Sequence, residues 1–366
     1  MGTRDTGAGI RNMFLDFYGL REQPFGVTPD PRFLYLSPAH REALASLYYG
    51  VESERGFLAL IAKPGLGKTT LLFHLLEKFR HNARTVFLFQ TQCNSREFMR
   101  FLLAEMGVGS QDQDFVRLHE QFNKMLLEES RAGRRFIVVI DEAQNLDASV
   151  LETVRLLSDF ETPQTKLLQI ILAGQPELAD KLASSHLAQL RQRVSLLNHL
   201  VPLSVEESGR YIAHRLRVAG YAGEPLFAPQ ALKAIARFTE GVPRNINNCC
   251  FNALSLGFAL GQKVVDLAMV EEVIQDLDIS RHVTEDAVAA PASVSVSGSN
   301  SASTIAGMTA RTVAVPPANG SRPDALTPAE AIAYMQQLSL RLKDWKHGAS
   351  FAGDGSGSSP KPGLLD

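Results

Sequence analysis

Residues 57–70, FLALIAKPGLGKTT, decide the fold of this chain. The five apolar residues from Phe57 to Ile61 are typical of a strand that is buried on both faces of a parallel sheet. Glycines and a proline follow, and a helix is expected from Lys68 to Phe79. A strand, a glycine-rich loop and a helix in this order form a phosphate-binding loop of the Walker A type. Its backbone N–H groups and helix N-terminus face phosphate oxygens.

The loop assigns roles to individual residues. Lys68 is expected to neutralise the β- and γ-phosphates of ATP, the Thr69 hydroxyl to bind Mg²⁺, and Thr70 to lie near the α-phosphate. Ala62 departs from the motif, which has glycine at its first position. We expect a negative φ there, which tolerates a methyl group; the alternative is that the methyl group crowds the loop and weakens binding. The expected nucleotide-binding residues of the loop are Ala62, Lys63, Pro64, Gly65, Leu66, Gly67, Lys68, Thr69 and Thr70.

A second apolar strand ends in two carboxylates. Residues 136–140 are uniformly apolar, and Asp141 and Glu142 follow them directly. In this position one carboxylate binds Mg²⁺ and the other polarises the water that attacks the phosphate. We therefore predict that Asp141 is a metal ligand, together with Thr69, and that Glu142 is the general base. The pair extends the prediction from nucleotide binding to ATP hydrolysis.

Strands and helices alternate through the first half of the chain. Further strands are expected at 85–89, 167–172 and 195–200, and helices at 38–49, 96–106, 115–130 and 151–160. This alternation predicts a three-layer α/β sandwich built on a parallel sheet. A capping box at Ser204 and Glu207 then opens an all-α region, with helices expected at 204–218, 229–238, 244–260 and 267–277.

The remaining segments complete the expected domain organisation. Residues 283–325 are rich in Ala, Ser, Val and Pro, and they cannot bury enough apolar surface to offset the entropy of ordering the chain. Thr327 and Glu330 cap a short amphipathic helix, expected to dock on a partner, on a neighbouring subunit or back on its own ATPase domain. The expected segments are a flexible N-terminus (1–13), the ATPase domain (14–202), an all-α lid (203–282), a disordered linker (283–325), the amphipathic helix (326–347) and a flexible tail (348–366).

Composition excludes several classes of protein. The 37 basic and 39 acidic residues nearly cancel, so the net charge does not call for nucleic acid or an anionic membrane surface. Cys93, Cys249 and Cys250 form no CxxC pair and are expected to be reduced thiols. We see neither a signal peptide nor a segment of the roughly 20 apolar residues that a membrane helix needs. A cytoplasmic protein without a membrane span is expected.

Four polar residues outside these motifs are candidates for the same chemistry. Gln175 follows a buried strand and is expected to reach the γ-phosphate or the attacking water, to cap the next helix, or both. Arg191 and Arg193 either enter the nucleotide site of a neighbouring subunit or lie on a solvated helix face. Arg244, in the first turn of a lid helix, is expected to fold back onto the phosphates.

Together these motifs resemble an AAA+ ATPase, and an N-terminal block narrows the resemblance to the ExeA/GspA type of general secretion pathway ATPase. The matching stretches are FYGL (17–20), PF (24–25), PDP (29–31), FLYLS (33–37) and GQPEL (174–178). The resemblance implies a helical lid, ATP hydrolysis at subunit interfaces and a homo-oligomer formed through the ATPase domain. It also makes Gln175 sensor 1, Arg244 sensor 2 and Arg193 the favoured arginine finger, because an apolar residue, Val194, follows it. Arg191 is the second choice.

The resemblance leaves the biological role open. Secretion ATPases of this type continue into a membrane helix and a peptidoglycan-binding part, which we do not find after residue 282. We therefore expect a cytoplasmic relative that acts as a motor or switch on a protein partner in secretion or in exopolysaccharide and envelope export. One alternative is a DNA-binding transposition regulator, which the near-neutral charge and the acidic residues 280–288 disfavour. Another is a nucleotide-gated scaffold without turnover, which would not need Glu142.

Overall fold

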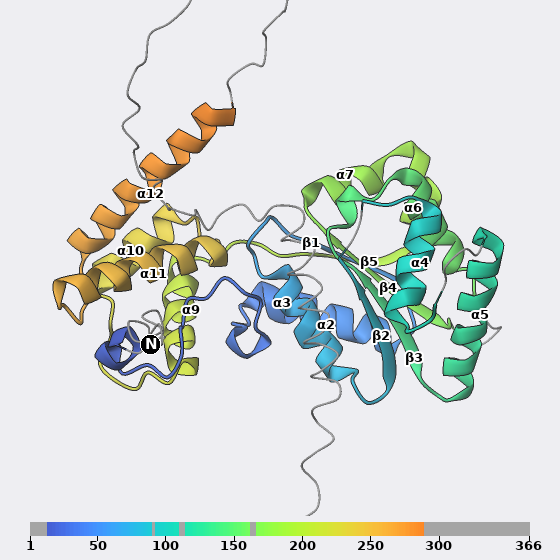
Figure 1. Ribbon diagram of the computed structural model, residues 1–366, viewed down its shortest axis with the longest axis horizontal. Helices are drawn as coiled ribbons and strands as arrows, with labels where there is room; N and C mark the ends of the chain where they lie inside the picture. Colours follow the sequence, from blue (N-terminus) through green and yellow to red (C-terminus); the bar gives the residue numbers. More distant parts are fainter. Residues whose placement is uncertain (1–12, 90–91, 110–113, 162–165, 289–366) are drawn as a thin grey trace, which may run out of the picture. The chain divides into compact units, whose positions relative to one another are not determined.

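A five-stranded parallel sheet forms the centre of the α/β domain in the computed structural model, which describes residues 13–89, 92–109, 114–161 and 166–288 (Figure 1). The strand order is β2-β3-β4-β1-β5, and each neighbouring pair is parallel. The strands are β1 (Phe57–Ile61), β2 (Ala83–Leu88), β3 (Arg135–Ile140), β4 (Leu168–Gly174) and β5 (Val194–His199). Every strand predicted from the apolar runs is therefore present, with small differences at the ends.

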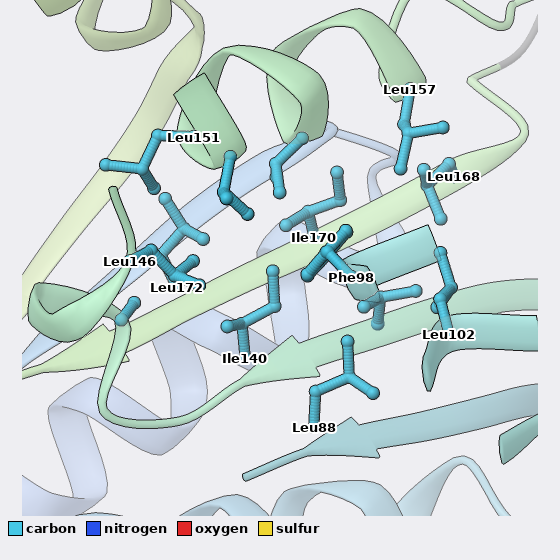
Figure 2. Close-up of a cluster of buried hydrophobic side chains, with 14 of the residues drawn as sticks. Leu88, Phe98, Leu102, Ile140, Leu146, Leu151, Leu157, Leu168, Ile170 and Leu172 are labelled. Carbon is cyan, nitrogen blue, oxygen red and sulfur yellow. The ribbon is translucent and has the colours of Figure 1, made fainter. Parts of the chain in front are cut away.

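Helices cover both faces of this sheet. Helices α2 (Pro38–Glu52) and α3 (Lys68–Lys78) pack on one face, against residues that include Ile137 and Val139 of β3. The other face carries Phe136, Val138 and Ile140. Figure 2 shows Ile140 among the buried side chains on this face. This face is covered by α4 (Ser95–Glu105), α5 (Phe115–Arg131), α6 (Ala148–Leu157), α7 (Pro176–Ala183) and α8 (Ala188–Arg193). Because β3 is buried on both faces, its sequence is an uninterrupted apolar run. The predicted three-layer sandwich is confirmed.

The helical domain consists of α9 (Val205–Val218), α10 (Pro229–Phe238), α11 (Pro243–Leu260) and α12 (Leu267–Val288). The predicted capping box is present, since Ser204 and Glu207 exchange hydrogen bonds at the start of α9. Helix α12 continues beyond the predicted end at Leu277 and includes residues 283–288, so the prediction that the disordered linker begins at residue 283 is wrong. No glycine or proline occurs between Leu267 and Val288, so nothing in the sequence stops the helix earlier.

The N-terminal aromatic block packs into the core of the helical domain. Tyr18, Phe25 and Phe33 are buried among side chains of α9, α10 and α11. The Tyr18 hydroxyl donates a hydrogen bond of 2.7 Å to the Leu254 carbonyl, more than 200 positions away in the chain. From this anchor the chain passes through a short 3₁₀ turn, η1 (Pro31–Phe33), to α2 on the sheet. The segment therefore belongs to the core of the helical domain at one end and leads to the sheet at the other.

Several expectations concern parts of the chain outside the described residues. These are the N-terminus up to residue 12, almost all of the linker, the amphipathic helix at 326–347 and the tail. Within the described residues, no helix is both long enough and apolar enough to cross a lipid bilayer. Cys93, Cys249 and Cys250 form no disulfide bond in the structure.

Candidate active site

The phosphate loop joins β1 to α3 at the carboxyl end of the sheet. Two of its glycines, Gly65 and Gly67, have φ angles of 82° and 88°, which glycine adopts without steric cost. A Cβ atom on Gly65 would lie 2.8 Å from Cβ of Arg244 and 3.0 Å from Cγ1 of Val242. The loop therefore touches the start of α11, and glycine is required at this position for two separate reasons.

Ala62 fits its position without strain. It is not among the described non-glycine residues with a positive φ, which confirms the expected backbone conformation. Its N–H donates to the Gly174 carbonyl at 2.9 Å, and the residue is only 2% exposed. Ala62 thus extends the pairing of β1 with β4 and packs behind the loop. It does not line the cavity described below.

The lysine, threonine and aspartate of the two motifs meet as the sequence predicts. Lys68 Nζ donates to Oδ1 of Asp141 and, at 2.9 Å, to Oε1 of Glu142. The Thr69 hydroxyl donates to Oδ2 of Asp141 at 2.6 Å. Lys68 and Asp141 are 7% and 2% exposed, so their opposite charges compensate each other where water is scarce. Asp141 lies behind Lys68 and Thr69 and does not itself line the cavity.

Glu142 adopts a φ of 53° and is held by hydrogen bonds on both carboxylate oxygens. Its Oε2 accepts from Nε2 of Gln144 at 2.7 Å and from Nε2 of Gln175 at 3.2 Å. Burial raises the pKa of Glu142, but the charge of Lys68 and the hydrogen bonds from Gln144, Lys68 and Gln175 outweigh it and lower the pKa. Glu142 is therefore ionised at neutral pH, which is the form that a general base requires.

Gln175 lies at the end of β4, between the strand of the phosphate loop and the strand of the two carboxylates. It is the N-cap residue of α7, but its side chain makes no capping hydrogen bond. Instead the amide donates to Glu142. The fold thus places Gln175 beside the candidate base.

A cavity of about 240 Å³ opens over the phosphate loop. Arg244 lines it with an exposed side chain, and its backbone N–H donates to the Gly65 carbonyl at 3.2 Å. The segments that follow β1, β3 and β4, the N-terminal segment and the helical domain all contribute to the walls. The lining residues are 26–30, 33–35, His40, 63–70, Glu142, Gln175, Leu203, Tyr211, Arg215, Pro243, Arg244 and Asn247.

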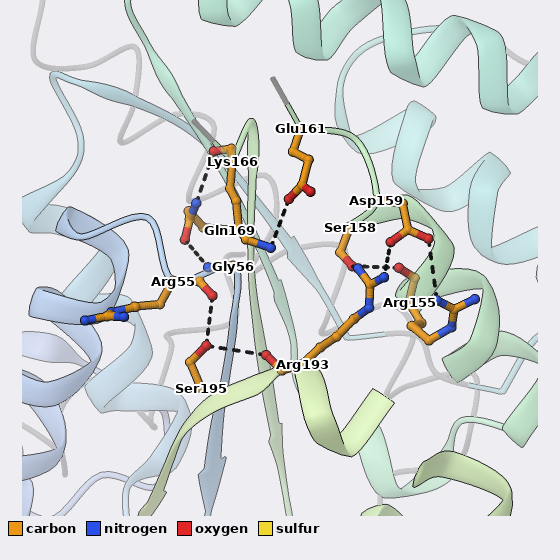
Figure 3. A network of polar contacts seen from close by, with 10 residues as sticks. All are labelled: Arg55, Gly56, Arg155, Ser158, Asp159, Glu161, Lys166, Gln169, Arg193 and Ser195. Atoms are coloured by element: carbon orange, nitrogen blue, oxygen red, sulfur yellow. Dashed lines mark hydrogen bonds and ion pairs between the residues drawn. The ribbon is translucent and has the colours of Figure 1, made fainter. Parts of the chain in front are cut away.

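Arg191 and Arg193 lie elsewhere, on α8, and neither lines this cavity among the described residues. Nη1 of Arg193 donates to the Ser158 hydroxyl at 3.0 Å, and its other terminal nitrogen forms an ion pair with Asp159 (Figure 3). Arg191 is exposed and donates to the Ala183 carbonyl at 2.9 Å. The structure therefore does not bring these two arginines to the phosphate loop of their own chain.

Comparison with known proteins agrees with the geometry. Residues 51–182 match the AAA domain family. General secretion pathway protein A of Aeromonas hydrophila is 39% identical over 250 residues, which are 68% of this chain and 46% of that protein. The chain contains an AAA domain and is similar to general secretion pathway protein A over the shared 250 residues. It spans less than half the length of that relative.

Solved structures share the fold of this AAA-domain protein. The Aeropyrum pernix ORC2 protein in ADPNP–ADP complexes has a TM-score of 0.52 and 13% identity, covering 69% of this chain and 71% of that chain. Drosophila ORC bound to DNA has a TM-score of 0.56 and 15% identity. The match covers 78% of this chain and 70% of that chain. At these identities the likeness shows the fold alone.

Sequence reasoning missed a buried histidine under the phosphate loop of this AAA-domain protein. His40 Nε2 lies 2.9 Å from the Leu66 carbonyl, and Nδ1 lies 2.8 Å from the Ser37 hydroxyl. A carbonyl can only accept, so the hydrogen-bond pattern assigns the proton to Nε2. Burial lowers the pKa of His40, which keeps the ring neutral. The sequence shows that His40 is a polar residue in the first turn of a predicted helix. It does not show that this residue contacts the phosphate loop.

Gln144 was missed as well. It lies two residues after Glu142 in the 3₁₀ turn η2 (Ala143–Asn145) and contacts both Glu142 and Gln175. The sequence shows a polar residue close to the carboxylate pair, but strand pattern and motif spacing do not show where a turn directs its side chains.

Proposed function

We propose that this chain binds ATP together with Mg²⁺ and hydrolyses it to ADP and phosphate. One observation carries the proposal: Lys68, Thr69, Asp141 and Glu142, from two separate motifs, form one hydrogen-bonded group at the mouth of the phosphate loop. Membership of the AAA domain family supports the same activity.

The residues present fit a magnesium ion that is bound together with nucleotide. The described residues contain no cluster of three or more His, Cys, Asp or Glu side chains that could hold a metal on its own. Mg²⁺ commonly binds through one or two protein oxygens, with water and substrate phosphates as the other ligands. The Thr69 hydroxyl and the Asp141 carboxylate supply such oxygens. When bound, the ion would neutralise charge on the phosphates.

Each side chain then has a defined task in hydrolysis. Lys68 would exchange its carboxylate partners for phosphate oxygens, because its ammonium group is a mobile point charge on a flexible stem. That exchange would leave Oε1 of Glu142 available to accept a hydrogen bond from the attacking water. Oε2 would stay bound to the two glutamine amides. Gln175 and Arg244, which both line the cavity, would contact the water or the γ-phosphate as sensors 1 and 2.

We propose further that hydrolysis is completed between subunits of a homo-oligomer, with Arg193 as the favoured arginine finger and Arg191 as the second choice. Both arginines lie outside the cavity of their own chain, which is consistent with action on a neighbour. Arg193 would have to exchange its contacts with Ser158 and Asp159 for a phosphate. A partly exposed ion pair of this kind stabilises by about 1 kcal/mol or less, so the exchange is feasible.

The partner is proposed to be a protein of a secretion or envelope-export apparatus. The identity of 39% to general secretion pathway protein A supports this assignment, although the shared region is 46% of that relative. The oligomer would act on this partner as an ATP-driven motor or switch.

Two measurements test the proposal. Titration with a fluorescent ATP analogue and Mg²⁺ should show saturable binding that Lys68→Ala removes; no saturation, or equal binding by the variant, would contradict it. Steady-state turnover is then measured for Lys68→Ala, for Arg193→Ala and for their mixture. The mixture should regain activity, because each variant supplies what the other lacks. Arg131→Ala, at the exposed end of α5, is the control and should keep full turnover.

A parallel turnover assay contains duplex DNA at two salt concentrations. Little change is expected. Strong stimulation that weakens with salt would favour the DNA-binding alternative over a protein partner.

A further inference from the structure

Gln144 stands between the candidate base and the candidate sensor. Its Nε2 donates to Oε2 of Glu142 at 2.7 Å, and its Oε1 accepts from the backbone N–H of Gln175 at 3.1 Å. A backbone N–H can only donate, and an ionised carboxylate can only accept. The amide of Gln144 therefore has a single orientation that satisfies both neighbours, and a carboxylate or an apolar side chain could not replace it.

The strand end is shaped to receive this amide. A Cβ atom on Gly174, the last residue of β4, would lie 2.7 Å from Oε1 of Gln144 and 2.8 Å from Cδ2 of Leu178. Gly174 has no positive φ, so backbone conformation does not explain the glycine. The absence of a side chain leaves the space that the amide occupies.

The backbone of the turn is held as well. Lys181 of α7 donates from Nζ to the Gln144 carbonyl at 2.6 Å and to the Leu146 carbonyl at 2.8 Å. Helix α7 begins directly after Gln175. The main chain of Gln144 is thus fixed to the helix that begins directly after the candidate sensor, which limits how far the amide can move relative to Glu142.

We infer that Gln144 is a positioning residue that fixes the Glu142 carboxylate for attack by water and couples it to Gln175. This inference rests on the proposed ATP hydrolysis. Gln144 is absent from the cavity lining, so it acts through Glu142 and not on the nucleotide. Once Lys68 has turned to the phosphates, Gln144 and Gln175 are the donors that hold Oε2, and Oε1 then faces the water.

This arrangement predicts a specific kinetic signature. Removal of the amide frees Glu142 to rotate away from the water but leaves the nucleotide contacts intact. The kcat should therefore fall while KM and analogue binding stay unchanged. Residues that orient the ligands of a metal ion from behind contribute about ten- to a hundred-fold to affinity or activity, and we expect a loss of similar size in kcat.

The test compares Gln144→Met with wild type for kcat, KM, binding of a fluorescent ATP analogue and urea midpoint. Gln230→Met, the same substitution at an exposed position on α10, is the matched control and should keep wild-type kcat. Gln144→Glu is the second variant. It keeps the shape of the side chain and its acceptor, so it remains informative if the methionine variant is poorly folded. It loses the donor and places a second carboxylate against Glu142, so its kcat should fall at least as far.

The outcomes separate this inference from the proposed function. If wild type hydrolyses ATP and either folded Gln144 variant keeps kcat within about twofold, the positioning role is wrong and the proposed function stands. A rise in KM or a loss of analogue binding with kcat unchanged would also overturn it, because Gln144 would then act on the nucleotide. If wild type binds the analogue without any turnover, hydrolysis and the positioning role fail together.

Discussion

Replacement of Gly65 by alanine tests the contact between the phosphate loop and the helical domain. Gly65 has a φ of 82°, and placing a non-glycine residue in that region costs about 1–2 kcal/mol. The new Cβ would lie 2.8 Å from Cβ of Arg244, which is not the flexible end of a side chain. Overpacking of this kind adds about 1–3 kcal/mol. The sum predicts that Gly65→Ala lowers the free energy of unfolding by about 2–5 kcal/mol.

A matched variant separates the two contributions. Gly133 has a φ of 68°, and a Cβ there would meet nothing within 4 Å. Gly133→Ala therefore carries the backbone cost alone, about 1–2 kcal/mol. Urea unfolding of both variants should show the larger loss for Gly65→Ala, and only that variant should bind the ATP analogue more weakly. Equal losses in the two variants would refute the contact between Gly65 and Arg244.

Two further predictions concern the buried polar groups that join the parts of this chain. Tyr18→Phe removes the hydrogen bond to the Leu254 carbonyl and should lower the free energy of unfolding in urea by about 1–3 kcal/mol. Tyr49 is 64% exposed. Because substitutions at exposed positions usually change stability little, Tyr49→Phe should lower the free energy of unfolding by less than about 0.5 kcal/mol. Equal costs at both tyrosines would contradict the anchoring of the N-terminal segment. Burial holds the pKa of His40 below its ordinary value of 6.5, so the unfolded chain takes up this proton at a higher pH than the folded protein. The stability that depends on neutral His40 should be complete above pH 6.5 and decline below it, by at most about 1.4 kcal/mol per pH unit. The free energy of unfolding is measured at pH 7.5 and at pH 5.5 for wild type and for His40→Gln. It should change less with pH in the variant than in wild type. Parallel curves would contradict a buried, neutral His40.

The sequence was sufficient to predict the sheet and the two motifs. Uninterrupted apolar runs such as 136–140 predict strands that helices cover on both sides. In the structure this run forms β3, whose side chains are buried on both faces of the sheet. The phosphate loop that follows β1 and the carboxylates that follow β3 are predicted to act on one nucleotide, and Lys68 does contact Asp141 and Glu142. Parallel strands end at the same edge of a sheet, so local sequence is enough to bring their last residues together.

Other features depend on contacts that no local pattern encodes. The aromatic block around Tyr18 supports the family resemblance, but its burial in the helical domain depends on residues far along the chain. Helices α7 and α8 have eight and six residues, too few for a repeated apolar spacing to delimit them. Gln144 could not be assigned because the direction of its side chain follows from the positive φ of Glu142 and from the space left at Gly174.

The most direct test of ATP hydrolysis through Glu142 is the steady-state turnover of Glu142→Gln, measured with saturating ATP and Mg²⁺. The amide keeps the size of the side chain but cannot accept a proton, so binding of the ATP analogue should persist. Turnover should fall by about 10²- to 10⁴-fold, the range that general base catalysis contributes. Turnover within about twofold of wild type, with binding retained, would contradict the assignment of Glu142 as the base.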